Sequence, residues 1–224
     1  MNLEGKIIDF LGDSITEGVG VEDITNCRYD NVLMRECNLK AVYNYGIGGT
    51  RLAHQSVPSE KPRHDLCFCG RAYDLNKDAD IIVVYGGVSD YLHGDAPFGT
   101  LDDTTPDTFC GAVDWLMGFL KEEYADKAIV FMTPAHCFYQ NISDAAPTNR
   151  PCKKPDARPL IEYVKVIEAR AKKHGIPVLN LYEKLGIDPN LTEHKEKYTT
   201  DGLHFNDAGQ AFIAARLKEF LEAL

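Results

Sequence analysis

Five short apolar runs recur along the chain, and four of them stop at a glycine or at a turn that contains proline. Runs of this length between turn signals are typical of β-strands. The run 79–85 (ADIIVVY) is the clearest, because a β-branched stretch closed by two glycines suits a strand buried on both faces. The predicted strands are 6–11, 41–47, 79–85, 128–132 and 177–181.

Segments with apolar residues near helical spacing separate these runs, so strands and helices alternate. The predicted helices span about 24–37, 66–75, 106–124, 159–174 and 206–224, the last with Asn206 or Asp207 at its N-cap. Alternation of this kind favours a parallel sheet covered by helices on both faces. No composition break or internal repeat divides the chain. We therefore expect one domain over 1–224, a three-layer α/β/α sandwich around a five-stranded parallel sheet.

Three polar motifs lie just after predicted strands or just before the last helix. They are Gly12-Asp13-Ser14, Gly48-Gly49 and Asp201-Gly202-Leu203-His204. In open parallel sheets the ligand crevice lies beyond the carboxyl ends of the strands. There the motifs offer a serine nucleophile, a backbone N–H for an oxyanion, and a histidine base oriented by an aspartate.

Each motif also has a purely structural interpretation. Gly-Asp-Ser can be a turn that caps a helix, Gly-Gly a tight turn, and Asp-Gly a turn that carries a surface histidine. The order and positions of the three together favour the hydrolytic interpretation.

Four segments also resemble the signature blocks of a known family, the SGNH (GDSL-type) hydrolases. Leu11-Gly-Asp-Ser-Ile-Thr-Glu-Gly18 resembles the first block, Asn44-Tyr-Gly-Ile-Gly-Gly-Thr50 the second, and Asp201-Gly-Leu-His-Phe-Asn206 the last. Gly87-Val-Ser-Asp90 occupies the place of the third block, usually Gly-x-Asn-Asp. The resemblance covers the whole chain. It implies a flavodoxin-like sandwich and an esterase or acylhydrolase that needs no cofactor.

The catalytic assignments follow from these blocks. Ser14 is the predicted nucleophile, and its own N–H can face the developing oxyanion. His204 is the predicted general base, and Asp201, three positions before it, can reach its Nδ1 and fix its tautomer. The register of the family block favours Gly49 over Gly48 as the second oxyanion donor.

The third block contains a departure from the family pattern. The family's asparagine provides a third oxyanion donor, and this chain has Ser89 there. A hydroxyl can donate, but its arm is shorter and its proton can point elsewhere. We include Ser89 in the predicted oxyanion hole, and expect Asp13 and Asp90 to hold loops in place.

Composition narrows the possible partners. The net charge is −10 and the pI about 5.1, so no polyanion-binding surface is expected and nucleic acid is excluded as a partner.

No apolar stretch is long enough to span a bilayer, and the N-terminus lacks the pattern of a secretory signal. Seven scattered cysteines favour reduced thiols in a cytoplasmic protein, with a secreted form that has lost its leader as the alternative. The sequence leaves open whether the protein forms a homo-oligomer.

No metal site is expected. Cys67, Cys69 and His64 are close in sequence, but a structural zinc site needs a second pair of ligands that the chain does not show.

The substrate is the least determined feature. Cations flank the predicted crevice, either as a lining for an anionic substrate or as solvated loop charge: Arg51, His54, Lys61, Arg63, His64 and Arg71 on one side, and Arg150, Lys153, Lys154 and Arg158 on the other. Aromatic residues can wall a pocket or pack the loops: Tyr91, Phe98, Phe138 and Tyr139. The polar loops favour a small-molecule ester with a small acyl group, such as acetyl on a carbohydrate.

Two other functions compete with a serine esterase that works through an acyl-Ser14 intermediate. The alternative within the fold is a low-activity or non-catalytic ligand-binding protein, because Ser89 replaces the usual asparagine. A flavin-binding protein is disfavoured, since the first strand is not followed by a Ser/Thr-rich phosphate loop.

Overall fold

A computed structural model describes residues 1–138 and 157–224. Its centre is a five-stranded sheet in which every pair of neighbours is parallel, in the order β2-β1-β3-β4-β5. This is the flavodoxin-like order, and it confirms the predicted fold class. The strands are β1 (Ile7–Gly12), β2 (Ala41–Gly46), β3 (Ile81–Tyr85), β4 (Ala128–Met132) and β5 (Val178–Leu179).

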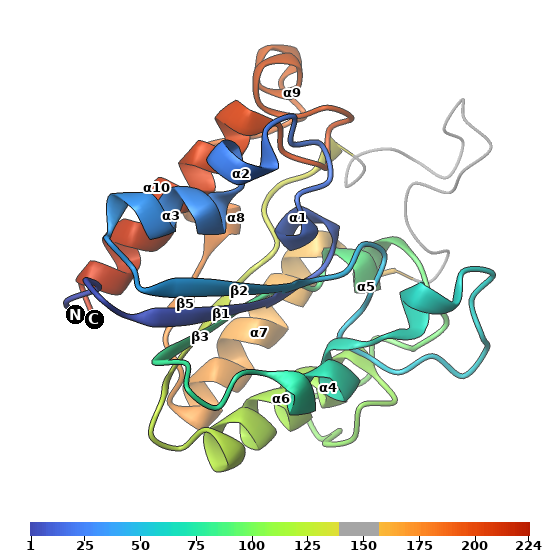
Figure 1. Cartoon of the computed structure of the whole chain (residues 1–224). Helices are drawn as coiled ribbons and strands as arrows, with labels where there is room; N and C mark the ends of the chain where they lie inside the picture. The colour runs from blue at the N-terminus through green and yellow to red at the C-terminus, as the bar shows by residue number, and fades with distance from the viewer. Residues whose placement is uncertain (139–156) are drawn as a thin grey trace.

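Helices cover both faces of the sheet, with α3 and α10 on one face and α6 and α7 on the other (Figure 1). The predicted helix 24–37 is in fact two helices, because Arg28 takes an extended conformation with ψ 135° between them. The helices that fall in predicted helical segments are α2 (Ile24–Cys27), α3 (Tyr29–Glu36), α4 (Phe68–Arg71), α6 (Phe109–Glu123), α7 (Leu160–His174) and α10 (Asp207–Glu222). Asn206 caps α10 as predicted, by accepting from the Gly209 N–H at 3.1 Å.

Several short helices were not predicted, and three of them begin directly beyond strand ends. These are α1 (Ser14–Glu17) after β1, α5 (Val88–Leu92) after β3 and α8 (Leu181–Lys184) after β5; α9 (Thr192–Tyr198) precedes α10. Segments this short carry too little periodicity to be read from the sequence.

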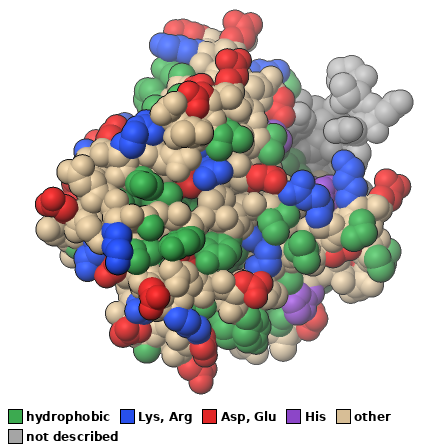
Figure 2. All heavy atoms as spheres, in the orientation of Figure 1, with side chains coloured by type: hydrophobic (Ala, Val, Ile, Leu, Met, Phe, Trp, Pro, Cys, Tyr) green, Lys and Arg blue, Asp and Glu red, His purple; other side chains and the backbone are tan. Residues whose placement is uncertain are grey.

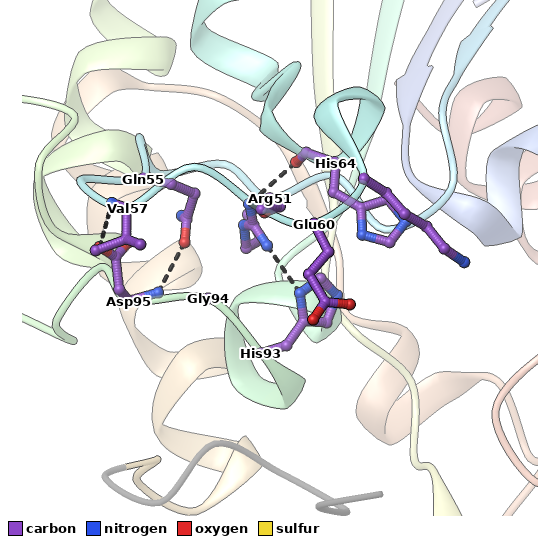
Figure 3. Close-up of a pocket in the computed structure, with 10 residues that line it drawn as sticks. Arg51, Gln55, Val57, Glu60, His64, His93, Gly94 and Asp95 are labelled. Carbon is purple, nitrogen blue, oxygen red and sulfur yellow. Dashed lines mark hydrogen bonds between the residues drawn. The ribbon is translucent and has the colours of Figure 1, made fainter.

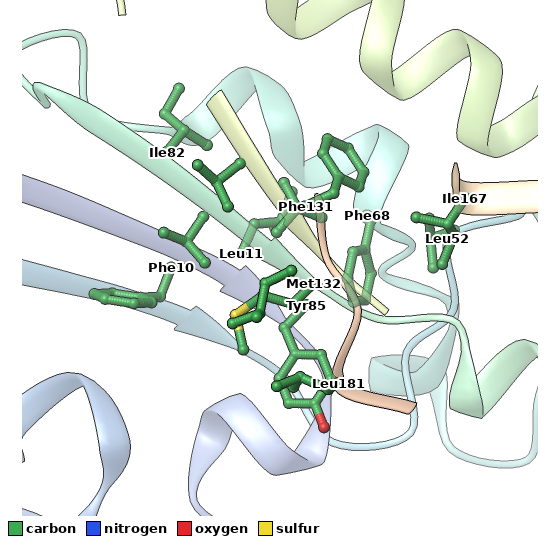
Figure 4. Packing of buried hydrophobic residues seen from close by; sticks show 14 of the residues in the cluster. Phe10, Leu11, Leu52, Phe68, Ile82, Tyr85, Phe131, Met132, Ile167 and Leu181 are labelled. Atoms are coloured by element: carbon green, nitrogen blue, oxygen red, sulfur yellow. The ribbon is translucent and has the colours of Figure 1, made fainter. Parts of the chain in front are cut away.

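Large apolar side chains fill the space between the sheet and its helices (Figure 4). All residues of β3 are buried, as expected for a central strand covered on both sides. Phe10 of β1 packs edge-to-face on Tyr29 of α3, with ring centroids 5.4 Å apart. This core fixes where the strand ends, and therefore α1 and α5, lie.

Two contacts fix α1 against its surroundings. A Cβ on Gly46 would come 2.2 Å from the Glu17 backbone nitrogen, so only glycine lets β2 approach α1 this closely. Gln210 of α10 is fully buried, donates to the Ile15 carbonyl at 3.2 Å and accepts from the Tyr29 N–H at 3.1 Å. The segment after β1 is thereby tied to the C-terminal helix.

Acidic and basic side chains are interspersed on the face shown in Figure 2. In the described residues, no helix is long and apolar enough to cross a bilayer.

Asp9 is an ionisable residue in the middle of the sheet and has no exposed surface. Burial raises its pKa from 3.8 to about 6, against the lowering effect of hydrogen bonds from the Asn76 N–H and the Tyr45 side chain. Between pH 3.8 and 6 the folded state keeps a proton that the unfolded chain has released, so stability falls as pH rises through this window.

We therefore expect Asp9→Asn to gain stability relative to the wild type as the pH rises. The difference in free energy of unfolding should move in favour of the variant by about 1–3 kcal/mol between about pH 4.5 and 8. Urea unfolding at the two pH values measures it. A difference that does not depend on pH would contradict a buried, charged Asp9.

Candidate active site

Ser14, His204 and Asp201 form one connected array. Ser14 is the first residue of α1, directly beyond β1, and its side chain is nearly buried. His204 Nε2 lies 2.9 Å from Ser14 Oγ, and His204 Nδ1 lies 2.7 Å from Asp201 Oδ2. Because the carboxylate can only accept, Nδ1 carries the proton and a neutral Nε2 accepts from the Ser14 hydroxyl.

The turn before α10 holds His204 in this position. Thr199 and Phe205 form an antiparallel bridge, and the Thr200 N–H donates to the His204 carbonyl at 2.9 Å. Asp201 Oδ1 accepts from the N–H groups of Leu203 and His204, at 2.9 and 2.8 Å. One carboxylate therefore shapes the turn with one oxygen and orients the imidazole with the other.

These bonds also keep Asp201 ionised. Burial raises its pKa, but the hydrogen bonds from the His204 side chain and from the two N–H groups outweigh burial and lower it from 3.8 to about 2. The negative charge beside His204 is thus present at any pH above this value.

Asp13 and Asp90 hold neighbouring loops, as predicted. Asp13 caps α1 by accepting from the Ile15 N–H at 3.0 Å, and Asp90 accepts from the N–H groups of Leu52 and Ala53 at 3.0 and 3.1 Å. Burial raises the pKa of Asp13 to about 6.

Ser89 is buried in α5, and its hydroxyl donates to Asp13 Oδ2 at 3.4 Å. The structure brings Ser89 close to the residue that precedes Ser14, with its proton directed at a carboxylate. Its donation to an oxyanion stays a prediction.

Gly48 and Gly49 follow β2 and lie beside α1. The Gly48 N–H donates to Glu17 Oε2 at 2.7 Å, and Arg63 donates to the other oxygen of Glu17 at 2.6 Å. Gly49 has φ +78°, a conformation that favours glycine. Its N–H meets no acceptor within residues 1–138 and 157–224.

Glu17 is a site residue that the sequence analysis missed. Through Gly48, its carboxylate fixes the peptide that precedes the Gly49 N–H. The available signal was its place inside the first block, three residues after Ser14.

A cavity of about 450 Å³ opens between the loops 51–65 and 93–95 (Figure 3). Most of the residues that line it are polar or charged, and they carry both signs of charge: Arg51, Lys61, His64, His93, Glu60 and Asp95 are among them. His64 belongs both to this cavity and to the surroundings of Gly49.

Two of the predicted crevice cations are internal supports. Arg51 is 2% exposed; it donates to the His64 carbonyl at 3.1 Å and pairs with Asp65 at 3.0 Å. Arg71 is buried and donates to the backbone carbonyls of Gly12, Tyr45 and Leu66. Neither behaves as solvated loop charge. Arg150, Lys153, Lys154 and Tyr139 lie outside the described residues.

Two of the predicted pocket aromatics pack inside the protein. Tyr91 and Phe98 both lie edge-to-face on Tyr163, with ring centroids 5.7 and 4.9 Å apart, and the Arg158 guanidinium lies over Phe98 at 4.5 Å. Phe138 adjoins the array, where its N–H donates to the Gly202 carbonyl at 2.8 Å.

The cysteines considered as metal ligands lie in and before α4. Cys67 Sγ accepts from the Gly70 N–H, and the Cys69 thiol donates to the Ala112 carbonyl. The described part of the chain contains no cluster of His, Cys, Asp or Glu arranged to hold a metal ion.

Ser14, His204 and Asp201 lie together beyond the carboxyl edge of a flavodoxin-like sheet, and comparison with known proteins places the chain in a family. The model of the GDSL-like lipase/acylhydrolase family matches residues 10–212. The chain belongs to this family, whose members are hydrolases of esters. No curated protein sequence matches it.

Solved structures agree with this placement. One is 28% identical over 100% of this chain and 99% of its own, with a TM-score of 0.84. A protein from Lactobacillus plantarum is 27% identical over 98% of both chains, with a TM-score of 0.81.

More distant structures share the fold. An acetyl xylan esterase is 19% identical over 95% of this chain and 98% of its own, with a TM-score of 0.62. A two-domain esterase active on acetylated mannans is 20% identical over 98% of this chain and 49% of its own, also with a TM-score of 0.62.

Proposed function

We propose that the chain is a serine esterase that cleaves a carboxylic ester through an acyl-Ser14 intermediate. The observation that carries this proposal is the double contact of His204, with Nε2 at 2.9 Å from Ser14 Oγ and Nδ1 at 2.7 Å from Asp201. A nucleophile, a base and an orienting carboxylate in one line are what acyl transfer to water requires.

The reaction proceeds in two halves. His204 Nε2 takes the Ser14 proton as Oγ attacks the ester carbonyl carbon, and the ionised Asp201 stabilises the imidazolium. The N–H groups of Ser14 and Gly49 hold the oxyanion until the C–O bond breaks and His204 protonates the departing alcohol. Water then attacks the acyl-Ser14 ester with His204 again as base, which releases the acid and restores the serine.

Two features support a small acyl group carried by a polar alcohol such as a carbohydrate. The cavity shares His64 with the surroundings of Gly49, and most of its lining residues are polar or charged, which favours hydroxyl-rich groups over a long acyl chain. Two proteins with the same fold are an acetyl xylan esterase and an esterase active on acetylated mannans.

A chain-length series tests this proposal. We expect kcat/KM for p-nitrophenyl acetate to exceed that for the octanoate at least about tenfold, since a polar site gains nothing from added methylenes. Acetate release from acetylated xylo- and manno-oligosaccharides, measured enzymatically, should accompany it. A preference for octanoate would contradict the small acyl group. Absence of turnover on every ester would favour the ligand-binding alternative.

A further inference from the structure

The imidazole of His64 lies directly against the Gly49 backbone. His64 stands in the 3₁₀ turn Pro62–Asp65 and is half-buried. A Cβ built on Gly49 would come 2.5 Å from Cδ2 and 2.6 Å from Nε2 of the ring. Cε1 lies at a similar distance, 2.9 Å, so the face of the ring lies against Gly49 with Nε2 in the contact; His64 also lines the cavity drawn in Figure 3.

This contact places Nε2 within reach of an oxygen held by the Gly49 N–H. A Cβ lies about 2.5 Å from its own backbone nitrogen, so the two nitrogen atoms are at most about 5 Å apart. One oxygen can accept hydrogen bonds of ordinary length, about 2.9 Å, from two donors at that separation. Neither ring nitrogen of His64 has a hydrogen-bond partner in the parts of the chain that the structure describes.

The turn that carries His64 is held firmly. Arg51, almost completely buried, donates to the His64 carbonyl at 3.1 Å and to Asp65 at 3.0 Å. Asp65 also accepts from the N–H and the hydroxyl of Ser59, at 2.8 and 2.6 Å. The ring thus lies against Gly49 on a preorganised support, which is the condition under which a donor stabilises a transition state well.

The charge state of His64 suits a neutral donor. Partial burial lowers the pKa of the imidazole, and the neighbouring cations Lys61, Arg51 and Arg63 lower it further, against the opposing effect of Asp65. At neutral pH the ring therefore carries a single N–H, which can sit on Nε2.

Ser89 was the predicted third donor to the oxyanion, but in the structure its hydroxyl donates to Asp13. The oxyanion hole therefore has room for another donor. We propose that His64 Nε2–H donates to the substrate oxygen held by the Gly49 N–H, and so completes the oxyanion hole from the loop 51–65. This proposal rests on the proposed esterase function.

Two substitutions separate donation from packing. His64→Ala removes both the ring and the donor, whereas His64→Phe keeps a ring against Gly49 but has no N–H. Both variants should lose on the order of 10²-fold in kcat on p-nitrophenyl acetate with little change in KM, because an oxyanion donor acts on the transition state. His64→Gln, which restores an N–H donor, should recover part of that loss. Ser56→Ala, at an exposed residue of the same loop, is the control and should keep wild-type kcat.

The outcomes are distinguishable. Wild-type kcat in both His64→Ala and His64→Phe, with turnover that still depends on Ser14, would overturn the role of His64 alone. Wild-type kcat in His64→Phe with a loss in His64→Ala would show that the ring acts by packing, which also overturns the proposal. A wild type whose turnover does not depend on Ser14 would overturn the esterase function together with it.

Discussion

Ser14→Ala is expected to lower kcat on p-nitrophenyl acetate by on the order of 10⁴-fold or more, since no acyl-enzyme can form without the nucleophile. Residual turnover above that in water would come from the oxyanion donors and from binding. The side chain is small, and its hydroxyl contacts His204. The melting temperature should therefore stay within a few degrees of the wild type, about the shift that 1 kcal/mol produces.

The measurement is kcat beside a thermal melt of the same preparation. Ser56→Ala is the matched control, because Ser56 is an exposed serine on the loop 51–65 whose loss should leave kcat unchanged. Turnover near the wild-type level in Ser14→Ala would remove Ser14 from the chemistry, while a collapse of the melting temperature would make it a structural residue.

The second large effect concerns the two partners of Ser14. His204→Ala should lose about as much kcat as Ser14→Ala, because the base that activates the hydroxyl is gone. Asp201→Asn should lose about 10²–10⁴-fold, since an amide NH₂ facing Nδ1 favours the tautomer with the proton on Nε2, where it can no longer accept from Ser14.

The double variant tests whether His204 and Asp201 act as one unit. Groups that act as a unit give losses that do not multiply, so His204→Ala combined with Asp201→Asn should be no slower than His204→Ala alone. Losses in kcat that multiply would mean that Asp201 and His204 act independently, which the 2.7 Å contact between them argues against.

Strand positions could be predicted because β-branched runs with glycine at their ends carry a strong local signal. The run 79–85 became β3, Ile81–Tyr85, and the other four strands also fell within their predicted runs to within a residue or two. The helix predicted over 24–37 failed at Arg28. That residue takes an extended conformation and its side chain bonds to Asp30 at 2.7 Å, a local contact that apolar spacing does not register.

Ser14, His204 and Asp201 could be predicted from the sequence, but the residues that hold the surrounding loops in place could not. Ser14 and His204 are 190 residues apart, and family blocks, rather than periodicity, indicated that they meet. For Arg51 and Arg71 the sequence left open a crevice lining or solvated loop charge. It does not show their burial, which comes with carbonyl and carboxylate partners distant in the chain. The sequence did not indicate that His64 lies beside Gly49 or that Glu17 bonds to Gly48, because these contacts form only in the folded chain.

Labelling with a fluorophosphonate, followed by mass mapping of the adduct, tests the central claim most directly, because this probe reacts with an activated serine whatever the natural substrate is. We expect one adduct per chain, on Ser14, with labelling strongly slowed in His204→Ala. No adduct on the folded wild-type protein, or an adduct on a different residue, would contradict a serine hydrolase built on Ser14, His204 and Asp201.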